Sequence, residues 1–210
     1  MSLSPLSSTS HGAWLPRAWR SLRDIAEEVP RDSFFEARQQ FSDENAGVEA
    51  FRAARQRLLQ PNGWKDLGPS WGAARFQVVP AQPRECPQVK LGDLLKIDLP
   101  GYPRSTWVQV ESVVDEPDRF QVLVRPTGAP GQAGVEHIFG EATTNTFSLQ
   151  RDGAEVVAQV HGQKEVANFT GPWWKDLMSA TFLWGGWMGG KDHQWKPFVE
   201  NLLGGPKRVD

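Results

Sequence analysis

TFSLQRDG, residues 146–153, encodes the first strand and the turn of a β-hairpin. Asp152-Gly153 is a strong turn signal, and the second strand continues over residues 155–160. His161-Gly162-Gln163-Lys164-Glu165 follows directly, and His137 precedes the hairpin. Side chains at the ends of strands are held by a rigid backbone and remain accessible. The ends of this hairpin are therefore where we look first for chemically active side chains.

Further short strands are predicted upstream of the hairpin, at residues 75–79, 94–99, 106–114 and 120–125. Their close spacing predicts a compact antiparallel sheet that curls into a β barrel or roll. Residues 91–97, followed by 107–110, look like the first strands of an SH3-like barrel, so the predicted barrel is SH3-like in part. This similarity concerns the fold and implies no function.

Helices are expected on both sides of the strand-rich region. Apolar residues at helical spacing run from Trp19 to Pro30, and Asp32-Ser33 can cap a next helix. Ser42-Asp43 can cap another helix, which ends at Pro61-Asn62-Gly63. The predicted organisation is an α+β fold with N-terminal and C-terminal helices packed on the sheet. Its four regions are a disordered tail (1–13), a helical N-terminal region (14–62), an antiparallel β domain (63–169) and a Trp-rich helical C-terminal region (170–210).

Composition excludes several classes of protein. The chain has 210 residues, 39% of them hydrophobic, which is typical of a globular protein. A formal net charge of -2 argues against general nucleic-acid binding. The single cysteine, Cys86, excludes an internal disulfide and disfavours a thiolate metal site. We see neither a secretory signal nor a transmembrane segment, which makes the cytoplasm the expected location, and no cofactor motif is present.

Tryptophan is unusually frequent, with ten residues against one tyrosine. Most are expected to pack in the core. Four near the C-terminus can instead form a surface that binds a protein partner or a membrane interface. These are Trp173, Trp174, Trp184 and Trp187. Burial of this segment against the sheet or in a homo-oligomer is the favoured interpretation, because four nearby glycines weaken a free amphipathic helix.

The candidate catalytic residues are His137, His161 and Glu165, with Glu136 beside them. If their strands are neighbours, these side chains can orient a histidine for proton transfer or bind a metal. No HExxH motif or other metal-ligand spacing is present, so no metal site is predicted. The favoured interpretation is a hydrogen-bond network that holds the backbone.

Other polar side chains near the hairpin are candidate ligand-binding residues. They are Glu136, Thr144, Asn145, Arg151 and Asn168. Thr and Asn side chains in such clusters more commonly satisfy local backbone groups. The carboxylates Asp93, Asp98, Glu111 and Asp115 are expected to be solvated, and Cys86 lacks the surroundings of a nucleophile.

Several motifs together resemble a family of uncharacterised bacterial proteins without an assigned activity. The most specific is Val160-His161-Gly162-x-x-Glu165-x-x-Asn168, where the family commonly has Arg-Asn in place of Gln163-Lys164. The others are Trp107-Val108-x-Val110-Glu111, Val124-Arg125-Pro126, His137-x-Phe139, residues 142–147 and Gln194-Trp195-Lys196. The resemblance covers most of the chain from Gly63 onward and implies an intact bacterial domain.

From these observations we expect a non-enzymatic binding or accessory protein that acts through its sheet face or its Trp-rich region. The alternative is a hydrolase or metal-dependent enzyme that uses His137, His161 and Glu165. The two differ in geometry, because an enzyme requires these side chains to converge in one concave pocket.

Overall fold

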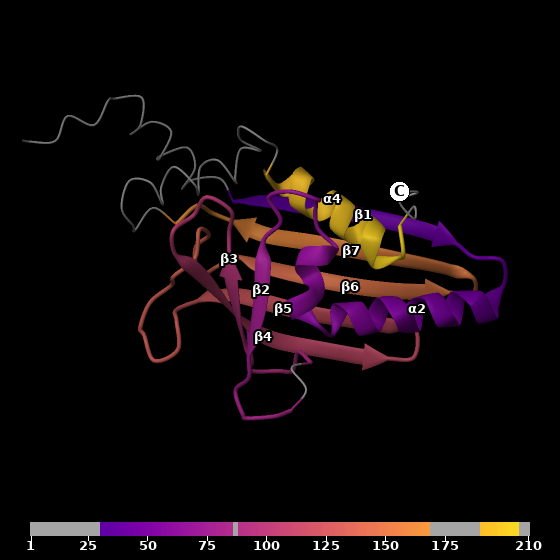
Figure 1. Ribbon diagram of the computed structural model, residues 1–210, viewed down its shortest axis with the longest axis horizontal. Helices are drawn as coiled ribbons and strands as arrows, with labels where there is room; N and C mark the ends of the chain where they lie inside the picture. Colours follow the sequence, from indigo (N-terminus) through magenta and orange to yellow (C-terminus); the bar gives the residue numbers. More distant parts are fainter. Residues whose placement is uncertain (1–29, 86–87, 169–189, 206–210) are drawn as a thin grey trace, which may run out of the picture.

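The computed structural model describes residues 30–85, 88–168 and 190–205, and these form one antiparallel sheet covered by helices. Seven strands pair in the order β1-β7-β6-β5-β4-β3-β2 (Figure 1). Their bounds are β1 (Arg31–Gln40), β2 (Arg75–Val79), β3 (Leu94–Asp98), β4 (Ser105–Glu116), β5 (Arg119–Thr127), β6 (Thr144–Asp152) and β7 (Glu155–Glu165). The predicted hairpin is β6–β7, with Asp152 opposite Glu155.

Three helical elements lie on one face of the sheet: α2 (Glu44–Leu58), the short 3₁₀ helix η1 (Pro61–Asp66) and α4 (Gly190–Leu202) (Figure 1). Helix α2 packs on β6 and β7, whereas α4 lies over β1 and β7. Within the described ranges, every helix is too short or too polar to span a lipid bilayer.

The α+β class is confirmed, but the prediction of a barrel or SH3-like roll is wrong. Strands β1 and β2 are the two edges of the sheet and do not pair with each other, so the sheet is open. A barrel buries its apolar face by closing on itself. Here the same face is covered by α2, η1 and α4, whose apolar side chains form one core with those of the sheet.

The prediction of a helix starting at Asp32-Ser33 is also wrong, because residues 31–40 form the edge strand β1. Ser33, Phe35 and Ala37 are partly buried toward the helices, whereas the residues between them are exposed. This alternation has the period of a strand. Strand β1 is defined by pairing with β7, a long-range interaction that local helix signals do not report.

Helix α2 is confirmed and begins where the sequence predicts. The Asp43 carboxylate caps it by accepting a hydrogen bond from the Ala46 amide at 2.9 Å. Phe51, Ala54 and Leu58 face the sheet. Gly47 permits close packing on the β6–β7 turn, because a Cβ atom there would lie 2.8 Å from the carbonyl oxygen of Gly153. The helix is thereby held against the hairpin turn.

An aromatic cluster around Trp64 joins the layers of the fold. Trp64 is fully buried and its ring contacts those of Phe76, Phe147 and Phe198, which come from β2, β6 and α4. Its indole N–H donates to the carbonyl of Arg57 at 3.2 Å. The expected role of tryptophan in core packing is therefore confirmed for Trp64.

We predict that Trp64→Ala lowers the free energy of unfolding by about 3–5 kcal/mol, because it leaves a cavity among three aromatic rings. Urea titration followed by circular dichroism measures this loss. Trp71→Ala is the matched control, since Trp71 is 57% exposed and should cost less than about 1 kcal/mol. Equal losses in the two variants would contradict the central position of Trp64.

Candidate functional site

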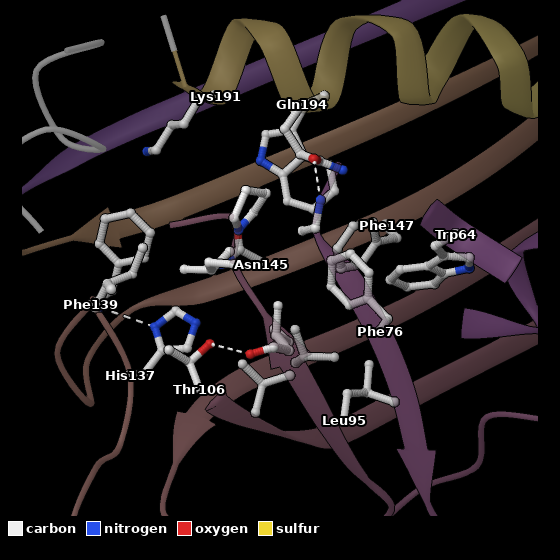
Figure 2. A pocket seen from close by; sticks show the side chains of 18 of the residues that line it. Trp64, Phe76, Leu95, Thr106, His137, Phe139, Asn145, Phe147, Lys191 and Gln194 are labelled. Atoms are coloured by element: carbon white, nitrogen blue, oxygen red, sulfur yellow. Dashed lines mark hydrogen bonds between the residues drawn. The ribbon is translucent and has the colours of Figure 1, made fainter. Parts of the chain in front are cut away.

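A cavity of about 320 Å³ lies between the sheet and α4. Most of its wall is apolar, and a few polar groups project into it from β4, β6, β7, α4 and the segment before β6 (Figure 2). Described residues of the apolar wall include Trp64, Phe76, Leu95, Ile97, Val108, Val124, Ile138, Phe139, Phe147 and Trp195. Its polar groups are Thr106, His137, Asn145, Glu165, Lys191, His193 and Gln194. Such a composition is typical of sites that bind small organic molecules.

A β-bulge at the end of β7 turns Glu165 toward this cavity. Two steps along β1, from Ser33 to Arg31, correspond to three along β7, from Gly162 to Glu165. The extra residue is accommodated by Lys164, whose φ of 50° is in the left-handed region. The Lys164 amide donates to Asp32 at 2.9 Å, and its carbonyl accepts a hydrogen bond from Thr143 at 3.0 Å. Glu165 therefore lies on the buried face of the sheet, as Gly162 does.

Gly162 provides the space for the Glu165 carboxylate. A Cβ atom on Gly162 would lie 2.7 Å from Glu165 Cδ and 2.7 Å from Ser33 Oγ. Ser33 donates to Glu165 Oε1 at 3.1 Å. The glycine in the His-Gly-x-x-Glu sequence is therefore explained by the buried carboxylate three residues later.

Lys191 from α4 forms an ion pair with Glu165 inside the fold. Its ammonium donates to Glu165 Oε2, and both side chains are almost completely buried. The Lys191 Nζ atom also lies 4.9 Å from the centroid of the Phe139 ring. Burial lowers the pKa of Lys191 below its usual value, and Glu165 counteracts this shift in part. The pair connects the last residue of β7 to the first turn of α4.

His137 reaches the cavity from the segment between β5 and β6. Its Nδ1 atom accepts a hydrogen bond from the Phe139 amide at 3.0 Å. Asn168 holds this segment, because its side chain donates to the carbonyl of His137 at 3.0 Å and its amide donates to that of Ile138 at 2.9 Å. Asn168 therefore positions the residues that line the cavity.

Gln194 carries a buried polar atom without a partner. Its Oε1 atom accepts a hydrogen bond from the Ala74 amide at 3.0 Å, which connects α4 to the start of β2 (Figure 2). The side chain is 6% exposed. Its Nε2 group is the one buried side-chain nitrogen or oxygen without a hydrogen bond in the described part of the chain.

The two candidate histidines lie on opposite faces of the sheet. His161 pairs with Phe34 and Thr146 across neighbouring strands, on the face away from the helices. Its ring contacts that of Phe34, which is 55% exposed, at a centroid distance of 5.7 Å. His137 and Glu165 both line the cavity. The structure thus brings two of the three catalytic candidates to one site and places His161 elsewhere.

The ligand-binding candidates are likewise divided between the cavity and other parts of the fold. Asn145 lines the cavity, whereas Thr144, one residue earlier on β6, points to the opposite face. Glu136 is outside the lining and pairs through its backbone with Trp107 and Thr127. Arg151 is at the far turn, where it donates to Asp118 at 2.8 Å and to the carbonyl of Gly153 at 2.8 Å.

Sequence reasoning missed the contribution of α4 to the site. Neither Lys191 nor Gln194 was a candidate site residue, although both line the cavity. The spacing of these two residues by one helical turn was the available signal, since it places both on one face of a helix. The partner-binding candidates Trp173, Trp174, Trp184 and Trp187 lie outside the described residues, as does Cys86.

No three His, Cys, Asp or Glu side chains within residues 30–85, 88–168 and 190–205 are grouped as metal ligands would be. Thr106, His137 and His193 hydrogen-bond the backbone, and Lys191 pairs with Glu165. The polar side chains that line the cavity can supply hydrogen bonds to a ligand.

No protein-family model and no curated protein matches the chain. Similar solved structures are distant. A hypothetical protein from Helicobacter pylori has 13% sequence identity, with 75% of this chain and 80% of that chain covered and a TM-score of 0.43. Norcoclaurine synthase from Thalictrum flavum, solved with dopamine and hydroxybenzaldehyde, has 12% identity over 86% and 96% of the chains and a TM-score of 0.38. Similarity at this level carries no argument about the function of this chain.

We predict that Gly162→Ala destabilises the protein by roughly 1–3 kcal/mol, because the new methyl group collides with Glu165 and Ser33. In a Glu165→Ala background the same change should cost less, since the carboxylate is gone. Gly63→Ala is the control, because a Cβ atom there meets nothing within 4 Å. If the effects of the two substitutions on the free energy of unfolding were additive, Gly162 would not be needed to make space for the Glu165 carboxylate.

We also predict that Lys191→Met lowers the free energy of unfolding by about 3–5 kcal/mol, because it leaves the Glu165 carboxylate buried and without its cation. The double variant Lys191→Met/Glu165→Leu should recover most of this loss in urea titrations. Arg52→Met, which removes one member of an exposed ion pair with Glu49, should change stability by less than about 1 kcal/mol. A double variant as unstable as the sum of its single variants would refute a coupled pair.

Proposed function

We propose that this protein is a non-enzymatic binding protein that takes up a small, mainly apolar molecule in the cavity between the sheet and α4. The observation that carries this proposal is the cavity itself, about 320 Å³ in volume and walled mostly by apolar side chains. This volume is at the lower end of the range for small-molecule sites. Burial of apolar ligand surface in such a cavity would supply the binding free energy.

The hydrogen bonds of the polar groups favour binding over turnover. Lys191 is paired with Glu165, the Nδ1 atom of His137 is bonded to the backbone, and Gln194 connects α4 to Ala74. These contacts hold the walls of the cavity in place. The charges of Lys191 and Glu165 compensate each other, which favours an apolar ligand group beside them.

An enzyme that uses His137, His161 and Glu165 is the alternative, and the position of His161 on the opposite face weighs against it. The motif from Val160 to Asn168 supports membership of the uncharacterised bacterial family that it resembles. A cytoplasmic location and a protein partner or homo-oligomer at the Trp-rich segment remain parts of the proposal.

We predict that the neutral dye N-phenylnaphthylamine gains fluorescence on binding the wild-type protein and raises its melting temperature. Ile97→Trp should reduce both effects, because the larger ring fills the cavity that Ile97 lines. Leu91→Trp is the matched control, since Leu91 is 67% exposed and is not part of the lining.

Near-UV circular dichroism checks that both variants retain a native core. If a folded Ile97→Trp variant bound the dye as well as the wild-type protein does, the cavity would not be the binding site. An unchanged melting temperature of the wild-type protein at saturating dye would count against the proposal in the same way.

A further inference from the structure

We propose that the ligand of this cavity is an amphipathic anion, with its apolar body inside the cavity and its anionic group outside, at Arg75. This inference rests on the proposed function and specifies the class of ligand and its orientation. It derives from a second depression of the surface, which is polar and adjoins the cavity.

The polar depression shares part of its wall with the cavity. Gly72, Leu99 and Pro100 line both. Gly72 precedes β2, and Leu99 and Pro100 follow β3, at the end of the strand pair where Arg75 is opposite Asp98. The depression has a volume of about 490 Å³ and is bounded on its other side by Lys65 and Asp66 of η1. A molecule bound in the cavity can therefore extend past the β2–β3 end into a polar, water-accessible space.

The charges in this depression are compensated except at Arg75. Lys65 pairs with Asp66 at 3.2 Å. Asp98 pairs with Lys96 at 3.6 Å and accepts a hydrogen bond from Ser105 at 2.6 Å. Arg75 forms no ion pair with any residue of the described ranges, although Asp98 is its cross-strand partner. An uncompensated guanidinium at the edge of an apolar cavity is complementary to a carboxylate or another oxyanion.

The part of the cavity beside Lys191 is less suited to an anion. Lys191 is the cation there, and it is already paired with Glu165. An anionic group placed beside Lys191 would be buried next to the Glu165 carboxylate and would be repelled by it. The anion of the ligand therefore avoids both charge repulsion and desolvation when it lies at Arg75.

The test compares three ligands with the same alkyl chain and different head groups: decanoate, decanol and decyltrimethylammonium. Isothermal titration calorimetry of the full chain at neutral pH should give the tightest binding for decanoate. Arg75→Gln should weaken decanoate binding by roughly fivefold and leave decanol binding unchanged, as expected for one partly exposed charge pair. Added salt should reduce the preference for decanoate in the wild-type protein.

Arg119→Gln is the matched control, because Arg119 is an exposed arginine on β5 that lines neither the cavity nor the depression. This variant should retain the preference for decanoate. Equal affinities of the wild-type protein for all three ligands would overturn the inference, as would a preference that survives in Arg75→Gln.

Ile97→Trp separates this inference from the proposed function. If the three ligands bind equally and Ile97→Trp abolishes their binding, the cavity remains a binding site and the role of Arg75 is rejected. If none binds, or if binding is insensitive to Ile97→Trp, both proposals fail. Binding of decanoate that requires Arg75 and is lost in Ile97→Trp supports both.

Discussion

The buried ion pair between Glu165 and Lys191 is the interaction on which the site depends. It joins the end of β7 to the start of α4, through two residues that are 26 positions apart in the chain. A buried carboxylate and a buried ammonium are each costly, and they persist because they compensate each other. Two nearby residues make this burial possible. Gly162 leaves space for the Glu165 carboxylate, and the left-handed backbone of Lys164 turns Glu165 toward the buried face. The ion pair thereby ties α4 to the sheet beside the cavity.

The cavity results from how the open sheet is covered. Helix α2 packs closely on β6 and β7 through Phe51, Ala54 and Leu58. The aromatic cluster around Trp64 fills the space where η1, β2 and α4 meet. Helix α4 lies over β1 and β7 and reaches β2 through Gln194. The space left between these contacts is enclosed mostly by apolar side chains.

Much of the fold could be predicted from local patterns. The β6–β7 hairpin is recognisable from Asp152-Gly153, and β2 was predicted at its observed bounds, Arg75–Val79. The start of α2 follows from the capping carboxylate of Asp43. Strand β1 could not be predicted in this way, because its identity comes from pairing with β7 more than a hundred residues later.

The candidate site was predicted in part. His137, Asn145 and Glu165 line one cavity. His161 and Thr144 point to the other face of the sheet, because successive side chains along a strand alternate between its two faces.

The sequence by itself determined the α+β class, the hairpin and the polar residues clustered around it, because these depend on turn chemistry and on periodicity over a few residues. The tertiary structure alone decided that the sheet stays open, that α4 contributes Lys191 and Gln194 to the site, and that the two histidines are separated. These features depend on contacts between distant segments. Their energies come from burial and charge compensation across layers of the fold, and neither is visible in the local spacing of residues.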